Sequence, residues 1–357
     1  MPNVSWERLR QAAARLWYGP DAMVEANLRK DIADLERHTK ALERRLHVAE
    51  HTVSTVGLAR PGVGEPANFA RWLTWRPPGH ASSPVPDVRE LEAAAERLWP
   101  EKLPTELPGI DLRPEEQLET FSTIAKIARA FDVSDRATEP WRYHSSNASY
   151  GVGDALTLHG MLRHVRPARI VAVGGGYAQA MILDTVEHYL GGRTDVTFIE
   201  QDAEALQSML RAPDRDRVTV ITEAIHDVTL DTFSDLQAGD VLFLESSHVL
   251  KTGSDVASIY ANILPRLNTG VYIHIHGIFY PFEYPREWVM EGRAYSELYV
   301  VRAFLVLNSD FEILLFNDWL AKLHEDRIAA DLPAMSGSEA TALWLRRTCT
   351  SQPVLAP

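Results

Sequence analysis

Between residues 168 and 316 short apolar runs alternate regularly with segments of helical periodicity. The apolar runs lie at 168–173, 195–200, 218–222, 241–244, 270–276 and 311–316. Helices are expected between them, at 178–189, 203–210, 255–264 and 296–308. Short runs that are apolar throughout are typical of strands that are buried on both faces. The alternation therefore predicts an α/β fold, a parallel sheet with helices on both of its faces.

The segments that flank this region differ from it in composition. Residues 1–58 predict helices, and apolar residues recur there at heptad spacing, as the series Leu28, Leu35, Leu42, Ala49 and the interleaved series Ile32, Thr39, Leu46. This spacing suits a dimerising coiled coil and equally a helix that lies on its own domain. Residues 59–112 are rich in proline and predict a connector or lid with one helix, Val88–Trp99. Residues 113–335 would form the main domain, starting with a helix at Pro114–Phe131, and 336–357 one more helix and a tail.

The charge of the chain argues against a nucleic-acid partner. The 36 Lys and Arg residues stand against 49 Asp and Glu, a formal net charge of −13, and no strong basic patch is present. No apolar run reaches the length of a membrane span, and the N-terminus lacks the apolar core of a signal peptide. The single cysteine, Cys349, excludes an internal disulfide and fits a reducing compartment. We therefore expect a cytoplasmic protein that acts on a small molecule, with neither nucleic acid nor membrane as partner, and a homodimer formed through the N-terminal helices.

Three consecutive glycines follow the first expected strand and precede a helix, in the segment Gly174, Gly175, Gly176, Tyr177. Glycine is needed where the backbone turns sharply and approaches a bound cofactor without a Cβ in the way. The next strand ends at Glu200, and a carboxylate at that place can accept hydrogen bonds from both ribose hydroxyls of an adenosine cofactor. Ala178 and Gln179 interrupt the full G-x-G-x-x-G pattern, which disfavours NAD relative to S-adenosylmethionine (SAM).

Two later strands are expected to deliver polar residues to the same edge of the sheet. Glu245 and His248 follow the run at 241–244, and His276 ends the run at 270–276. His248 could act as a general base or could be a satisfied loop histidine. Glu245 could orient a substrate or bind a cation, and the three side chains together could hold a metal such as Mn, Fe or Zn. His274, one pleat deeper, is expected to be a hydrogen-bonded core histidine.

The chain resembles a bacterial family of class I SAM-dependent methyltransferases of natural-product and sugar pathways, related to metal-dependent sugar O-methyltransferases and to cephalosporin-hydroxylase-like proteins. The segments that carry the resemblance are Glu116–Leu118, Tyr150–Ala155, Gly174–Thr185, Phe198–Glu200, Ser246–Asp255, Ile263–Leu267, Tyr280–Trp288 and Phe316–Asp318. The resemblance implies a Rossmann-like sheet. It also implies that Gly174 and Gly176 hold the methionine part of SAM, that Glu200 holds its ribose and that Asp227 flanks the adenine. His248 matches the histidine that follows the fourth strand.

Three positions depart from the family pattern. Ala172 replaces an acid before the glycines, Glu245 replaces an Asp, and Gly277 replaces the Asp of a His-Asp pair. The leading hypothesis is methyl transfer from SAM to an oxygen, nitrogen or carbon atom of a small metabolite, with His248, Glu245 and His276 as candidate catalytic residues. A second is oxidative or lyase-type chemistry at a centre of Fe, Mn or Mg held by Glu245, His248 and His276. A third is a degenerate, non-catalytic partner of another subunit.

Overall fold

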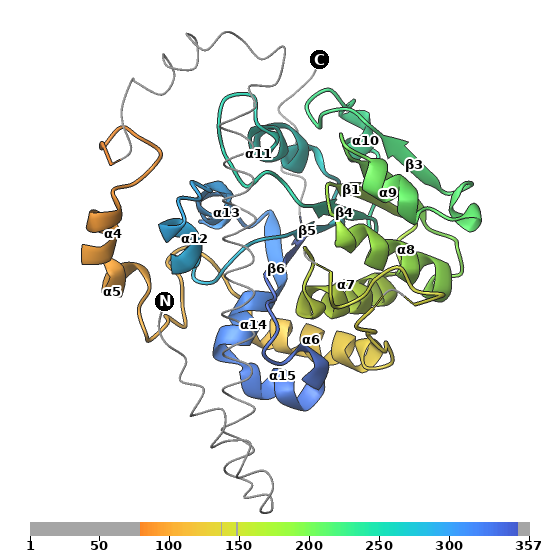
Figure 1. Ribbon diagram of the computed structural model, residues 1–357, viewed down its shortest axis with the longest axis horizontal. Coiled ribbons are helices and arrows are strands. Elements are labelled where there is room, and N and C mark those ends of the chain that lie inside the picture. The colour runs from red at the N-terminus through yellow and green to blue at the C-terminus, as the bar shows by residue number, and fades with distance from the viewer. Residues whose placement is uncertain (1–78, 137, 148, 349–357) are drawn as a thin grey trace, which may run out of the picture. The chain divides into compact units, whose positions relative to one another are not determined.

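The computed structural model describes residues 79–136, 138–147 and 149–348. The helices expected in residues 1–58, the first part of the connector and the tail that contains Cys349 lie outside the described residues. Seven strands form one sheet, in the order β3-β2-β1-β4-β5-β7-β6 (Figure 1). The strands are β1 (Arg169–Val173), β2 (Asp195–Ile199), β3 (Val218–Ile221), β4 (Val241–Leu244), β5 (Tyr272–Ile275), β6 (Phe311–Phe316) and β7 (Leu343–Arg347).

The first five strands are parallel, and their order is that of a doubly wound sheet. β7 is antiparallel to both of its neighbours, β5 and β6, so β6 runs in the same direction as the first five. The strand order reverses between β1 and β4, and ligands of open α/β sheets bind beyond the carboxyl ends of the strands at such a point. The sequence prediction of a Rossmann-like α/β fold is confirmed.

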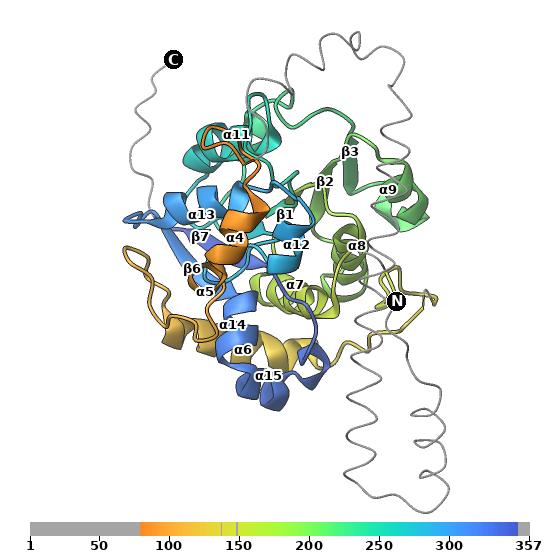
Figure 2. The same ribbon diagram turned by 60° about the vertical axis from the view of Figure 1, so that its left-hand side comes forward.

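Helices cover both faces of the sheet. In both views α6 and α7 lie on one side and α11 and α13 on the other (Figures 1 and 2). The helices are α4 (Val88–Ala93), α5 (Ala95–Leu98), α6 (Pro114–Ala128), α7 (Val152–Val165), α8 (Tyr177–Tyr189), α9 (Glu204–Met209), α10 (Asp231–Ser234), α11 (Asp255–Ser258), α12 (Arg286–Met290), α13 (Glu297–Leu305), α14 (Asn317–Leu323) and α15 (Glu325–Asp331). None of the helices in the described residues combines the length and the apolar character that crossing a membrane requires.

The expected helix between Val88 and Trp99 is present as two short helices. α4 begins where the side chain of Asp87 accepts a hydrogen bond from the backbone N–H of Arg89, and the helical path is interrupted at Ala94. The indole Nε1 of Trp99 donates to the carbonyl of Tyr284 at 2.8 Å. This bond attaches the end of the connector to the aromatic segment that follows β5.

The prediction of a helix beyond residue 336 is wrong for residues 336–348, the part of this segment that the structure describes. Leu343, Trp344 and Leu345 are fully buried in β7, which lies between β5 and β6. A strand with neighbours on both sides and layers on both faces is apolar at successive positions. It therefore lacks the alternation that would distinguish it from a buried helix.

Candidate functional site

The glycine loop joins β1 to α8 in a conformation that side chains rarely adopt. Gly174, Gly175 and Gly176 have φ values of 65°, 128° and 45°. A Cβ at Gly174 would overlap the backbone oxygen of Glu245, the first residue after β4. The loop therefore needs glycine both for its turn and for the close approach of the ends of β1 and β4.

A cavity of about 370 Å³ opens beside this loop, at the carboxyl ends of β1, β2 and β4. The residues that line it are Val173, Gly174, Gly175, Gly176, Ile199, Glu200, Gln201, Glu223, Ile225, Glu245, Ser246, Ser247 and Asp255. The cavity lies where the order of the strands reverses, which is the place where this class of sheet binds its ligands.

The charged residues that line the cavity are all acidic. They are Glu200, Glu223, Glu245 and Asp255, and the lining contains no Lys, Arg or His. Burial raises the pKa of the Glu200 carboxyl above its ordinary value, and Gln179 Nε2 donates to it at 3.4 Å. Carboxylates gathered in a cleft attract a cationic ligand and repel phosphate groups. The cavity is therefore suited to a ligand that carries positive charge.

The structure brings some of the predicted cofactor residues to this cavity and leaves others outside it. The three glycines and Glu200 line it. Tyr177 instead faces a neighbouring hollow, where its hydroxyl lies 3.3 Å from His144 Nε2. The side chain of Asp227 is 68% exposed and is not part of the lining, to which Glu223 and Ile225 of the same segment contribute.

His248 lies one residue beyond the wall of the cavity, in a tightly held loop. Its Nδ1 is 2.8 Å from Oε2 of Glu297, the first residue of α13. The same carboxylate oxygen accepts a hydrogen bond from Ser246 Oγ at 2.5 Å, and Ser246 lines the cavity. Sequence reasoning missed Glu297, because only the fold brings residues 49 positions apart into contact.

His276 and Glu245 lie near the His248–Glu297 pair, and each has a buried polar atom without a hydrogen-bond partner in the described part of the chain. His276 Nδ1 and Glu245 Oε2 form no hydrogen bond among the described residues, and Asp154 Oδ2 is 3.7 Å from the same His276 nitrogen. Burial lowers the pKa of His276, which favours the neutral imidazole. His274 is fully buried and lies 3.3 Å from the hydroxyl of Tyr150, as expected of a hydrogen-bonded core histidine.

The predicted three-ligand metal centre does not fit this geometry. Within the described residues no three His, Cys, Asp or Glu side chains are arranged to hold a metal ion. Of the proposed ligands, His248 directs Nδ1 to Glu297, and Glu245 lines the cavity of the glycine loop.

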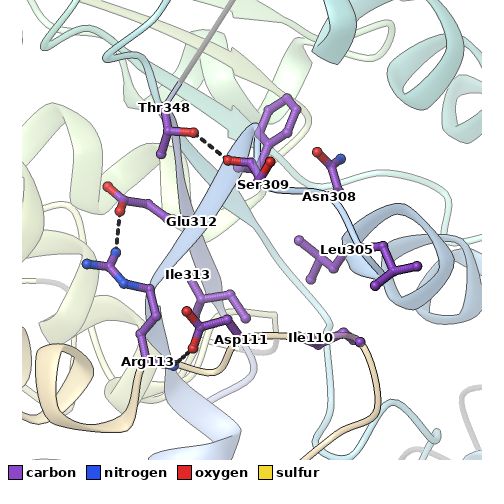
Figure 3. A pocket seen from close by; sticks show the side chains of 12 residues that line it. Ile110, Asp111, Arg113, Leu305, Asn308, Ser309, Glu312, Ile313 and Thr348 are labelled. Carbon is purple, nitrogen blue, oxygen red and sulfur yellow. Dashed lines mark hydrogen bonds and ion pairs between the residues drawn. The ribbon is translucent and has the colours of Figure 1, made fainter. Parts of the chain in front are cut away.

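A larger cavity, of about 430 Å³, lies at the opposite, amino-terminal edge of β6 (Figure 3). Ile110, Leu305 and Phe311 supply its apolar lining, and Arg113 and Glu312 pair with each other across it. None of the site residues predicted from the sequence lines it. Because it lies away from the carboxyl ends of the strands, it is a less suitable place for a cofactor.

Comparisons with known proteins identify similar folds. No family model matches the chain. A protein of Archaeoglobus fulgidus described as uncharacterized is 29% identical over 126 residues, which cover 35% of this chain and 57% of that protein. The match thus spans little more than half of the length of this relative.

Solved structures that are similar to the chain include the following three. An apo structure of CmcI is 15% identical to this chain. The match covers 80% of this chain and 97% of the CmcI chain, with a TM-score of 0.36. The O-methyltransferase TomG from Streptomyces achromogenes, involved in tomaymycin synthesis and solved with SAM, is 15% identical to this chain. The match covers 73% of this chain and 96% of TomG, with a TM-score of 0.36. An O-methyltransferase from Bacillus cereus, in complex with SAH, is 10% identical, with coverages of 72% and 97% and a TM-score of 0.34. These scores are too low to transfer an activity to this chain.

Proposed function

We propose that the chain is a SAM-dependent methyltransferase that acts on a small molecule. The observation that supports this most directly is the acidic, glycine-walled cavity at the carboxyl ends of β1, β2 and β4. SAM combines an adenosine with a positively charged sulfur and an ammonium group. Four carboxylates favour such a ligand, whereas the phosphates of NAD or ATP would be repelled.

Within the cavity the chain offers the groups that an adenosine cofactor needs. Gly174 to Gly176 let the backbone approach the methionine part without a side chain in between. Glu200, which follows β2 and lines the cavity, would accept hydrogen bonds from the ribose hydroxyls. When bound, SAM supplies an electrophilic methyl group. His248 directly follows Ser247, a residue that lines this cavity.

In this proposal His248 is the general base. For a hydroxyl acceptor, Nε2 of His248 would take up the hydroxyl proton as the acceptor oxygen receives the methyl group that SAM would supply. The contribution of the protein would otherwise be alignment of the acceptor with the methyl group. Desolvation lowers the pKa of His276, which makes its imidazole a weaker base and suits it to a supporting role. Action in natural-product or sugar biosynthesis and a homodimer through residues 1–58 stay predictions.

Calorimetry with separate titrations of SAM, S-adenosylhomocysteine, NAD and ATP tests the proposal. We expect binding of the first two ligands only. Absence of SAM and S-adenosylhomocysteine binding, or preferential binding of NAD, would overturn it. A panel of hydroxyl- and amine-bearing metabolites, with release of S-adenosylhomocysteine as the signal, then tests transfer. Cofactor binding without release by any acceptor would favour the non-catalytic partner.

A further inference from the structure

We propose that Glu297 is a positioning residue, which holds His248 in the tautomer that carries its proton on Nδ1 and leaves Nε2 free to act as a base. The catalytic consequence rests on the proposed methyl transfer, whereas the tautomer itself does not.

The first support is the environment of the Glu297 carboxylate. The residue is fully buried, and it forms no ion pair with Lys or Arg among the described residues. A buried carboxylate without a cation is unfavourable unless hydrogen bonds satisfy it. Here Oε2 is bonded to His248 Nδ1 and Ser246 Oγ, and Oε1 accepts from the hydroxyl of Tyr260 at 3.2 Å. The donors thus converge on this carboxylate from the loop that follows β4 and from the helical segment Ile259–Ile263.

The second support is the backbone that joins the two residues. His248 has a φ of 59°, in the left-handed region that is unfavourable for a non-glycine residue. Its carbonyl oxygen accepts hydrogen bonds from the backbone N–H groups of Ser296 and Glu297, at 2.8 and 3.1 Å. Ser296 Oγ in turn accepts from the N–H of Leu250 at 2.8 Å. The start of α13 therefore fixes the loop of His248 as well as its ring.

The third support is the space around the imidazole. A Cβ at Gly277, the second residue after β5, would lie 2.7 Å from Cε1 and 3.1 Å from Nε2 of His248. On another side the ring of Tyr295 packs at a centroid distance of 5.4 Å. The ring is thus confined on two sides, and Nδ1 faces Glu297.

The chemistry of this contact determines the tautomer. A carboxylate can only accept, so the proton of a neutral imidazole must be on Nδ1. Nε2 then carries the lone pair, and within the described residues it has no hydrogen-bond partner. A base needs such an available lone pair.

Nitrogen NMR of protein labelled with ¹⁵N-histidine tests the proposal without SAM or an acceptor. The His248 signals are assigned by their loss in His248→Gln. At about pH 8 the wild-type ring should show the Nδ1–H tautomer. Glu297→Met removes the acceptor at similar volume, and we expect the Nε2–H form to become dominant. Tyr260→Phe, which removes a donor to Oε1 only, should leave the tautomer unchanged.

A wild-type ring in the Nε2–H form, or an unchanged tautomer in a folded Glu297→Met, would overturn the proposal. If Glu297→Met does not fold, the wild-type signal still decides. Once an acceptor is known, Glu297→Met should reduce kcat by about 100-fold or more while the Kd for SAM stays within about twofold. The expected tautomer in a protein that does not bind SAM would sustain this inference and refute the proposed function.

Discussion

The imidazole of His248 occupies the space that a side chain at position 277 would need. Gly277 has a φ of 76°, and its Cα faces the ring edge between Nδ1 and Nε2. The loops that follow β4 and β5 are therefore interdependent, because the first can hold its histidine only if the second carries glycine. In the sequence comparison Gly277 stands where the resembling family has an Asp. The structure adds a steric reason for glycine at this position.

Replacement of this glycine by alanine should displace the ring of His248. We expect Gly277→Ala to reduce turnover by about 100-fold, because small misplacements of a catalytic group have effects of this size. SAM affinity, measured by calorimetry, should be retained, since Gly277 does not line the cavity. Gly292→Ala is the matched control, because Gly292 also has a positive φ of 85° but open space around it. Equal losses in both variants would show that backbone strain alone is responsible.

Replacement of the first glycine of the loop should weaken cofactor binding. A Cβ at Gly174 would meet the carbonyl oxygen of Glu245, so Gly174→Ala must separate the ends of β1 and β4. We expect the Kd for SAM to rise at least about tenfold, equivalent to about 1.4 kcal/mol. Gly191→Ala is the matched control, because Gly191 has the same positive φ of 65° but nothing among the described residues within contact distance of a Cβ there. Calorimetry should find its SAM affinity unchanged; a tight-binding Gly174→Ala would contradict the position assigned to the cofactor.

Removal of the charge of Glu200 should weaken SAM binding. Hydrogen bonds to charged groups contribute about 1.5–3 kcal/mol, so Glu200→Gln should raise the Kd at least about tenfold. The same change at Asp227, Asp227→Asn, should have little effect, since that side chain is exposed and outside the cavity. The resemblance to methyltransferases implies the opposite for Asp227. A large effect of Asp227→Asn would therefore restore that assignment.

His159 should make the protein sensitive to acid. It is fully buried in α7, its Nδ1 is 2.9 Å from Thr185 Oγ1, and Nε2 faces the guanidinium of Arg163 at 3.3 Å. Burial lowers the pKa of His159 to about 3. An unfolded chain, with a pKa of about 6.5, binds more protons than the folded one between these values. Its contribution to stability is thus complete above pH 6.5 and is lost as the pH falls towards 3.

Denaturation with urea at two pH values measures this effect. Between about pH 7 and about pH 5 the wild type should lose about 2 kcal/mol of unfolding free energy through His159. His159→Gln should lose correspondingly less, although it is less stable at neutral pH. His164→Gln, on the exposed side of the same helix, should follow the wild type. An equal acid loss in His159→Gln would assign the proton uptake to other groups.

The sequence predicts the first six strands well because burial is encoded locally in their composition. Val241–Leu244 is apolar at every position and is fully buried at every position. The same reasoning is wrong for β7, whose identity depends on the two strands between which it lies. It also misses α7, in which every residue from Gly153 to Leu162 is buried, so that no polar face marks a helical period.

In the candidate site too, some residues can be recognised from the sequence and others only from the fold. Gly174 and Glu200 can be recognised from the sequence because each directly follows a predicted strand, and the two strands are consecutive in the chain. Glu297 carries no comparable signal, since an acid at the start of a helix is common for electrostatic reasons alone. Its contact with His248 arises only when α13 packs beside the loop that follows β4. Sequence reasoning can thus identify a candidate base but not the residue that orients it.

The position of β7 has a consequence for synthesis of the chain. It is the last of the described strands to leave the ribosome, yet it lies inside the sheet, between β5 and β6. Backbone N–H groups just before it also bond the buried carboxylate of Asp154, from Thr341 and Ala342. β6 can therefore join the sheet only after residues 341–347 have emerged, so the domain cannot complete its folding before this last described strand is available. Nascent chains that stop short of β7 should expose the edge of β5 to proteases and chaperones.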